Sequence, residues 1–249
     1  MATWIAHLRI AELLLPDLPG LDEAMFAVGN IAPDSGIPDE KWEKFTPPSE
    51  VTHFQAPERA QHACADLDFY RAYLTSCRLD VEGLRYAFLL GYFCHLVADN
   101  LWSLWIGKPT YRRFIEQFEA DHNFIWEVKK DWYGLDFEYV RSHPDSLYWR
   151  VFLGCEYPVN YLNVVLTEGV RQRIVYIQDY YQRTDAHVEE LVSRERVYLT
   201  QPEMDTFVHK TANLLNEAIQ GLTQERYELE NLHSILEVFG PSLFIENGR

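Results

Sequence analysis

Residues 92–102, YFCHLVADNLW, place an imidazole and a carboxylate, His95 and Asp99, inside an otherwise apolar stretch. At a separation of four residues the two side chains lie on the same face of a helix. The run from Tyr86 to Val97 is apolar nearly all round, which in a globular protein indicates a central, buried helix. Burying an unpartnered polar group costs roughly 2–7 kcal/mol, so His95 and Asp99 need either a hydrogen-bond network or a divalent metal ion.

The composition is that of a folded globular chain. Of its 249 residues 47% are hydrophobic and 14% aromatic, and no fixed repeat or low-complexity run is present, so we expect one domain over residues 1–249. The 22 Lys and Arg against 38 Asp and Glu give a formal charge of -16. This charge disfavours a stable complex with nucleic acid, but carboxylates that bind metal still permit a small or zwitterionic phosphate substrate.

The sequence shows neither a signal peptide nor a membrane-spanning segment. The first twenty residues lack a basic n-region, and His7, Arg9 and Glu12 interrupt any apolar core, so no signal peptide is evident. The uncharged run between Arg85 and Asp99 is shorter than the roughly 20 residues of a membrane-spanning helix. We therefore predict no transmembrane segment and a cytoplasmic location.

Hydrophobic periodicity predicts an all-α, single-domain, multi-helix bundle with a buried metal site. Strand alternation is nearly absent, and residues 26–50, dense in Gly, Pro and Asp, predict one long irregular loop. A capping box at Thr200 to Glu203 opens the last predicted helix. The predicted helices cover residues 4–15, 57–76, 81–106, 110–131, 158–183 and 201–236.

Three further residues can join His95 and Asp99. His7 lies on the apolar face of the first predicted helix, Asp34 lies in the long loop, and His53 follows that loop. Helical bundles build metal sites from side chains on facing elements. Three imidazoles and two carboxylates on four successive elements can bind two zinc-like ions, one carboxylate bridging them.

Four segments, in this order, resemble the zinc-dependent phospholipase C family, whose superfamily includes the fungal single-strand nucleases: AHLRIAELLL (6–15), GNIAPDSG (29–36), THF (52–54) and LLGYFCHLVADNLW (89–102). The resemblance is clearest over residues 4–106. It implies a phospholipase C/nuclease-like bundle that binds two Zn²⁺ ions. It assigns Asp34, His53, His95 and Asp99 to one ion, and His7 with the shared Asp99 to the other.

Such a pair of ions implies hydrolysis of a phosphoric ester. Two-metal hydrolases hold their ions about 3.5–4 Å apart, lower the pKa of a bound water and neutralise phosphoryl oxygens. Asp34 is the candidate catalytic general base. The same ligands would also accept manganese or iron.

The sequence departs from the family pattern at two places. Secreted members bind metal through the free amine of an N-terminal Trp, whereas Trp4 is internal here. The family's third metal site begins with a His at the position of Trp105. In EADHNFIWE (119–127), Asp121, His122 and Glu127 could supply a modified third site, although a solvated helix face explains them equally.

The predicted function is a metal-dependent phosphoric ester hydrolase similar to zinc-dependent phospholipase C, acting on a phospholipid or small phosphoester. One alternative is a nuclease or nucleotidase of the same superfamily, which an exposed aromatic pair near the metals would favour. The other is a catalytically inactive helical binding protein, motivated by Trp105 and the missing amine. Assays of a lipid diester and an oligonucleotide separate the first two, and metal content separates both from the third.

Overall fold

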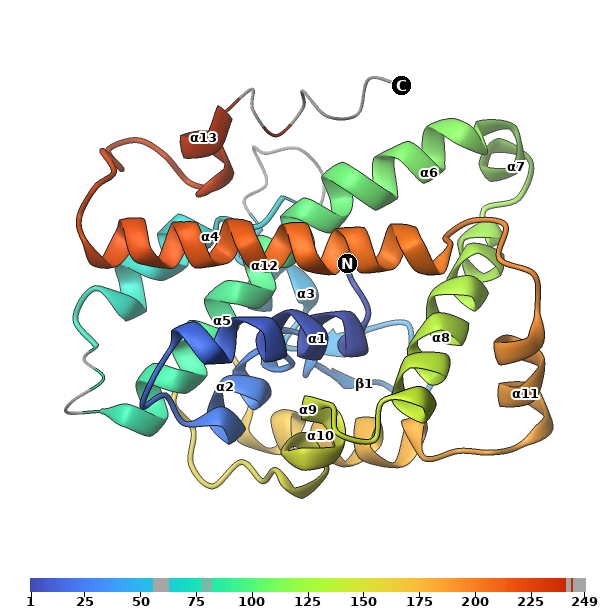
Figure 1. Cartoon of the computed structure of the whole chain (residues 1–249), viewed down its shortest axis with the longest axis horizontal. Coiled ribbons are helices and arrows are strands. Elements are labelled where there is room, and N and C mark those ends of the chain that lie inside the picture. The colour runs from blue at the N-terminus through green and yellow to red at the C-terminus, as the bar shows by residue number, and fades with distance from the viewer. Residues whose placement is uncertain (56–62, 78, 80–81, 241–242, 244–249) are drawn as a thin grey trace.

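The computed structural model describes residues 1–55, 63–77, 79, 82–240 and 243, and over these residues the chain is mostly helical (Figure 1). The only strands in these ranges are β1 (Ile37–Pro38) and β2 (Phe45–Thr46), which form one short antiparallel pair. The predicted all-α class is therefore confirmed for the described part of the chain.

Helix α5 (Gly83–Trp102) is the buried centre of the bundle. Every residue from Ala87 to Trp102 is buried, as the apolar run predicts, and a π-helical turn (Ser103–Gly107) continues it. His95 and Asp99 therefore lie inside the core. Among the described helices, none is both long and apolar enough to cross a membrane.

Helix α2 (Glu23–Gly29) packs on α5 with the two backbones in direct contact. A Cβ atom at Gly91 would lie 2.3 Å from the carbonyl oxygen of Phe26, and one at Gly29 would lie 2.1 Å from the carbonyl oxygen of Phe88. Only glycine fits at such distances, because the added carbon would overlap backbone atoms. This close approach brings the backbone that follows α2 against the middle of α5.

Helix α1 (Trp4–Leu14) lies beside α12 (Gln201–Thr223), which runs across the front of the molecule in Figure 1, and also contacts α5. Thr3 caps α1 by accepting a hydrogen bond from the backbone of Ala6. The predicted capping box is present at the start of α12, between Thr200 and Glu203. These caps fix where the two helices begin, and His7 consequently faces α5.

The remaining elements surround this centre, with α11 (Ala186–Ser193) packed beside α8 (Phe124–Ser142) at one side of the molecule (Figure 1). They are the 3-10 turn Leu15–Asp17, the 3-10 turn η2 (Ala32–Asp34), α3 (Ser49–Thr52), α4 (Asp66–Phe69), the π-helical turn Tyr70–Leu74, α6 (Lys108–Arg113), α7 (Ile115–Ala120), α8 (Phe124–Ser142), α9 (Leu147–Arg150), the 3-10 turn Phe152–Gly154, α10 (Thr167–Tyr181), α11 (Ala186–Ser193) and α13 (Leu236–Phe239).

The prediction of one irregular loop over residues 26–50 was wrong in part: α2 and α3 overlap its two ends, and η2, β1 and β2 lie within it. Asp22 caps α2 by accepting a hydrogen bond from the backbone of Met25 at 2.8 Å. The cap and the burial of the apolar residues that follow outweigh the local density of Gly and Pro.

Two long predicted helices are interrupted by side chains that bond the backbone. The segment 110–131 is divided among α6, α7 and α8. Between α7 and α8 the side chain of Asp121 accepts a hydrogen bond from the backbone of Asn123 at 2.8 Å, which stabilises the turn that interrupts the helix. The segment 158–183 becomes helical only at Thr167, since Asn160 bonds the backbone of Leu162 and Val165.

Two further predicted helices are shorter than expected. In 57–76, residues 57–62 lie outside the described ranges, and residues 63–65 are not helical because Asn100 of α5 bonds both backbone groups of Cys64. In 201–236 the helix ends at Thr223. Glu225 and Asn231 beyond it have φ of 51° and 64°, which a right-handed helix excludes.

Candidate metal centre

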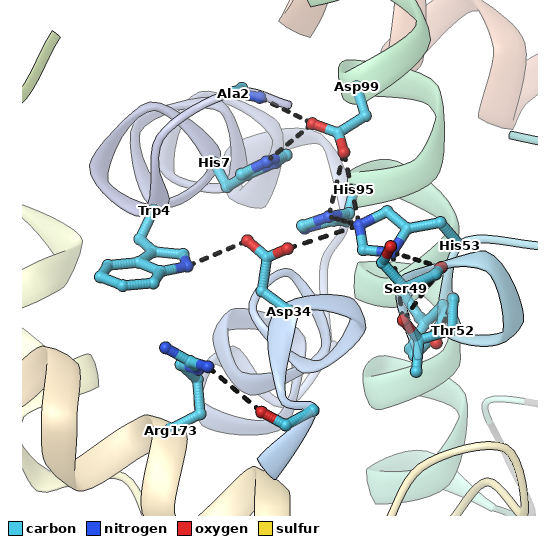
Figure 2. Close-up of polar contacts among 12 residues, drawn as sticks. Ala2, Trp4, His7, Asp34, Ser49, Thr52, His53, His95, Asp99 and Arg173 are labelled. Carbon is cyan, nitrogen blue, oxygen red and sulfur yellow. Dashed lines mark hydrogen bonds and ion pairs between the residues drawn. The ribbon is translucent and has the colours of Figure 1, made fainter. Parts of the chain in front are cut away.

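Four elements bring the predicted ligands to one place in the core (Figure 2). One ligand comes from α1, one from η2, one directly follows α3, and two come from α5. Four of the side chains are almost completely buried, and the fifth, that of Asp34, is 13% exposed. We call these residues the central cluster: His7, Asp34, His53, His95 and Asp99.

The first half of the central cluster has the spacing of donor atoms around one ion. Nε2 of His53 lies 3.3 Å from Nε2 of His95, 3.4 Å from Oδ1 of Asp34 and 3.5 Å from Oδ2 of Asp99. Nε2 of His95 also lies 3.5 Å from Oδ2 of Asp99. Ligand atoms at about 2.1 Å from a tetrahedral ion are separated by about 3.4 Å. These four separations therefore match a shared cation.

Hydrogen bonds on the far side of two rings determine which nitrogen faces the cluster. Nδ1 of His95 donates to the carbonyl of Asn30 at 2.8 Å, and Nδ1 of His53 lies 3.1 Å from both the carbonyl of Ser49 and the hydroxyl of Thr52. The Thr52 hydroxyl has the same carbonyl of Ser49 as an acceptor, at 3.4 Å. A carbonyl only accepts, so Nδ1 carries the proton in each neutral ring, and Nε2 presents a lone pair. Two lone pairs at 3.3 Å repel one another unless a proton or a cation lies between them.

The second half of the cluster consists of His7, His95 and Asp99. The rings of His7 and His95 stack with centroids 3.9 Å apart, and Nε2 of His7 lies 3.4 Å from Oδ1 of Asp99. Neither ring nitrogen of the fully buried His7 has a hydrogen-bond partner among the described residues, nor has Oδ2 of Asp99. Leaving such atoms unsatisfied costs about 1–3 kcal/mol each.

Asp99 presents one oxygen to each half. Oδ1 faces His7 and accepts a hydrogen bond from the backbone of Ala2 at 2.7 Å, while Oδ2 faces the other two imidazoles. This is the placement of a carboxylate that bridges two ions. Donor-atom groupings of His7, His95 and Asp99 and of Asp34, His53 and His95, each within 4.8 Å, fit a metal ion at each half.

The electrostatics of the cluster favour added positive charge. Burial alone would raise the pKa of Asp34 and Asp99. The hydrogen bond with His53 and the charge of His95 nevertheless hold the pKa of Asp34 below its ordinary value, and the N-terminal amine and His95 do the same for Asp99. The carboxylate of Asp99 in turn raises the pKa of His95 against the effect of burial, so without a metal ion this imidazole favours the added charge of a proton. Burial and the charge of His95 lower the pKa of His7 to about 4, so this ring is neutral at physiological pH. Neutral imidazole with ionised carboxylate is the protonation state that binds a divalent metal.

Trp4 has a place in the site that the sequence did not predict. Its indole Nε1 donates to Oδ2 of Asp34 at 2.9 Å, which orients the other oxygen toward His53 (Figure 2). Trp4 precedes His7 by three residues and therefore shares its helix face, which is the signal that could have indicated this contact.

The residues considered for a third metal site do not come together. Asp121 and His122 are exposed, and Glu127 pairs with Lys130 and Arg194. Over the described ranges the two groupings above are the only ones of three or more metal-binding side chains, so this hypothesis is not supported. The break between α7 and α8 turns these side chains outward.

A cavity of about 510 Å³ opens beside the central cluster, which forms one wall through Asp34 and His53. The sequence did not predict it, because its lining comes from segments far apart in the chain. Much of the remaining wall is aromatic, with two basic side chains: Trp4, Trp42, Phe45, Trp126, Trp132, Tyr133, Tyr176, Tyr180, Lys129 and Arg173.

Comparison with known proteins identifies no relative. No family model, no curated protein and no solved structure matched the chain. The resemblance to the zinc-dependent phospholipase C family therefore remains an expectation from the sequence.

Proposed function

We propose that this protein is a metal-dependent phosphoric ester hydrolase whose central cluster binds two zinc-type ions. The observation that carries the proposal is the pair of buried imidazole nitrogens, His53 Nε2 and His95 Nε2, facing each other at 3.3 Å with carboxylate oxygens at 3.4–3.5 Å. With the neutral rings bonded outward through Nδ1, the two Nε2 atoms and the carboxylate oxygens are all acceptors, so a cation is needed between them, and a divalent metal ion meets this need for all four donor groups at once.

The residues present fit such ions in chemistry as well as in spacing. Imidazole and carboxylate are the ligands that zinc takes, and a cavity beside them gives a substrate access to one side. When bound, such ions act as Lewis acids on a phosphoryl oxygen and make water a better nucleophile at neutral pH. The resemblance of the sequence to zinc-dependent phospholipase C supports the same reaction class and a similar fold.

Within this proposal Asp34 accepts the proton of the attacking water. It lines the cavity, and its depressed pKa keeps the carboxylate ionised at neutral pH. The hydrogen bond from Trp4 to Oδ2 orients the carboxylate of Asp34 so that Oδ1 faces His53. Asp99 is positioned to hold both ions, because each of its oxygens faces a different half of the cluster.

A nucleotidase or nuclease is the second candidate. Trp42 and Tyr176 lie at the cavity with their ring centroids 6.3 Å apart, and they are 56% and 40% exposed. Exposed aromatic faces beside a phosphate-cleaving centre can stack a base. A catalytically inactive binding protein is the third reading, and the metal measurement below decides it.

The test begins with the metal content of the purified protein, measured by elemental mass spectrometry. We expect about two equivalents of zinc or a similar ion in the native chain and loss of metal in His95→Ala and Asp99→Ala. Hydrolysis of a lipid diester, a small aryl phosphodiester and a single-stranded oligonucleotide then identifies the reaction. A native chain that takes up no metal from added zinc would overturn the proposal and favour a binding protein.

A further inference from the structure

Two basic side chains in the cavity have no part in the proposed chemistry. Arg173 of α10 and Lys129 of α8 come from separate helices to the same aromatic lining that Asp34 enters. A basic side chain that is largely buried normally pairs with a carboxylate, because removing its charge from water is costly. Among the described residues, no carboxylate lies within ion-pair distance of either.

Arg173 lies next to the candidate metal centre. It is 9% exposed, its Nη2 donates to the carbonyl of Gly36 at 3.4 Å, and its Nε has no hydrogen-bond partner among the described residues. Its guanidinium lies 5.2 Å from the ring centroid of Trp4, whose indole bonds Asp34. Figure 2 shows Arg173 extending from its helix toward the side of the cluster that carries Trp4 and Asp34.

Lys129 lines the same cavity from helix α8. Its ammonium is 4.6 Å from the ring centroid of Trp126, a residue that is itself 58% exposed. Burial lowers the pKa of Lys129, although the carboxylate of Asp34 acts in the opposite direction. The charges of Lys129 and Asp34 therefore attract each other across the cavity, but the two side chains form no ion pair.

We propose that Lys129 and Arg173 form an anion subsite, so that the cavity takes an anionic phosphate ester with a planar or apolar body. Two uncompensated positive charges among aromatic faces attract a phosphate or carboxylate group while the rings cover the rest of the ligand. A quaternary ammonium group would need electron-rich faces without nearby positive charge. The subsite therefore disfavours a choline-type ligand, including the zwitterionic head of a choline phospholipid.

The inference rests on the proposed function only for the cleavage of the bound ester, since binding by the two side chains needs no metal. The test uses chelator-treated full-length protein, and Trp fluorescence or calorimetry measures the binding of phenyl phosphate and phosphocholine. We expect phenyl phosphate to bind at least about tenfold more tightly than phosphocholine, and high salt to weaken its binding.

Variants distinguish binding at Lys129 and Arg173 from non-specific attraction of an anion to the positive charges of the protein. Lys129→Met keeps the apolar stem, and Arg173→Gln removes the charge; each should weaken phenyl phosphate binding about tenfold or more, while Arg173→Lys restores part of it. Lys130→Gln is the matched control, because this neighbour on α8 pairs with Glu127 at the surface. Should Arg173→Gln not fold, as judged by circular dichroism, Lys129→Met decides the result.

The outcomes are distinct from those of the metal test. Equal affinity for phosphocholine and phenyl phosphate, or an equal loss in Lys130→Gln and Lys129→Met, would overturn the anion subsite even in a protein that binds two ions. Conversely, charge-dependent binding of phenyl phosphate in a protein that holds no metal would support the subsite and contradict the proposed hydrolase.

Discussion

The core contains two kinds of buried carboxylate. They differ in whether hydrogen-bond donors of the chain satisfy their oxygens, and this difference distinguishes structural carboxylates from a candidate metal ligand. Asp66 accepts hydrogen bonds from Ser234 Oγ at 2.6 Å, the backbone of Ile235 at 2.7 Å and Asn100 Nδ2 at 2.9 Å. Asp99, in the central cluster, instead has an oxygen without a hydrogen-bond partner in the described chain.

Asp136 behaves like Asp66. One oxygen accepts from the hydroxyl of Thr3 at 2.7 Å and the other from the hydroxyl of Tyr181 at 2.6 Å, so the chain itself satisfies both. Asp66 joins α4 to the segment before α13, and Asp136 joins α8 to α1 and α10. A buried carboxylate supplied with donors holds a fold together, whereas one that faces imidazole lone pairs is suited to a cation.

The largest expected effect comes from Asp99→Asn, which keeps the shape of the side chain and removes its charge. Metal affinity should fall by more than the roughly 10- to 100-fold that follows loss of an outer-shell partner, since a ligand of both ions is lost. Equilibrium dialysis with zinc measures it. Unchanged affinity would show that Asp99 is a structural carboxylate like Asp66 and would end the contrast.

The second prediction concerns the backbone contact between α2 and α5, which positions the central cluster. In Gly91→Ala the new carbon would lie 2.3 Å from the carbonyl oxygen of Phe26, so α2 must move away from α5. We expect a loss of about 1–3 kcal/mol in the free energy of unfolding. Metal affinity should also fall, because the carbonyl of Asn30 that orients His95 moves with α2.

Denaturant unfolding and zinc titration measure both quantities for this variant. Gly83→Ala is the matched control, since it changes the same helix at a position where the new carbon meets nothing within 4 Å. If Gly91→Ala lowered stability but left metal affinity at the native value, the orientation of His95 would not depend on the approach of α2.

The third prediction concerns Asp66→Asn. One of its amide hydrogens would oppose donors that now bond a carboxylate, and we expect a loss of about 1–3 kcal/mol in the free energy of unfolding at pH 8. The metal content should stay at that of the native chain. The two readouts, measured together with those of Asp99→Asn, give opposite patterns if the carboxylates have the roles assigned here.

The last prediction is a pH dependence at Asp136, which has no effect on the metal site. Burial raises its pKa to about 7, against the hydrogen bonds of Tyr181 and Thr3, whereas in the unfolded chain it titrates near its ordinary value of about 4. The folded state therefore holds a proton that the unfolded state releases between about pH 4 and 7. Over this window the free energy of unfolding decreases as pH rises, by no more than about 1.4 kcal/mol per pH unit.

Comparing native and Asp136→Asn chains isolates this contribution, because Asp66, whose pKa burial also raises to about 7, is present in both. Chemical denaturation of metal-free protein at pH 5 and pH 8 measures it, and the difference in unfolding free energy between the two chains should shift toward the variant at pH 8. A difference that does not change with pH would mean that Asp136 is ionised throughout.

The sequence by itself determined the central helix and the residue types at its heart. A run that is apolar all round can only be buried, so His95 and Asp99 had to share a buried face, and His7 had to face inward from its own helix. Helical class followed from periodicity, which depends on neighbours a few residues apart.

Helix ends were less predictable. They depend on single side chains that compete for backbone groups, as Asn100 does at Cys64 and Asn160 does before α10. In the first case the competing residue lies on another helix, beyond the reach of any local pattern.

Only the tertiary structure decided the geometry of the site. The backbone contact of α2 with α5 places a carbonyl behind His95, the fold brings Trp4 onto Asp34, and helices α8 and α10 bring Lys129 and Arg173 to one cavity. Sequence spacing carries no information on such distances, because they arise from the packing of segments whose order along the chain does not determine their separation in space.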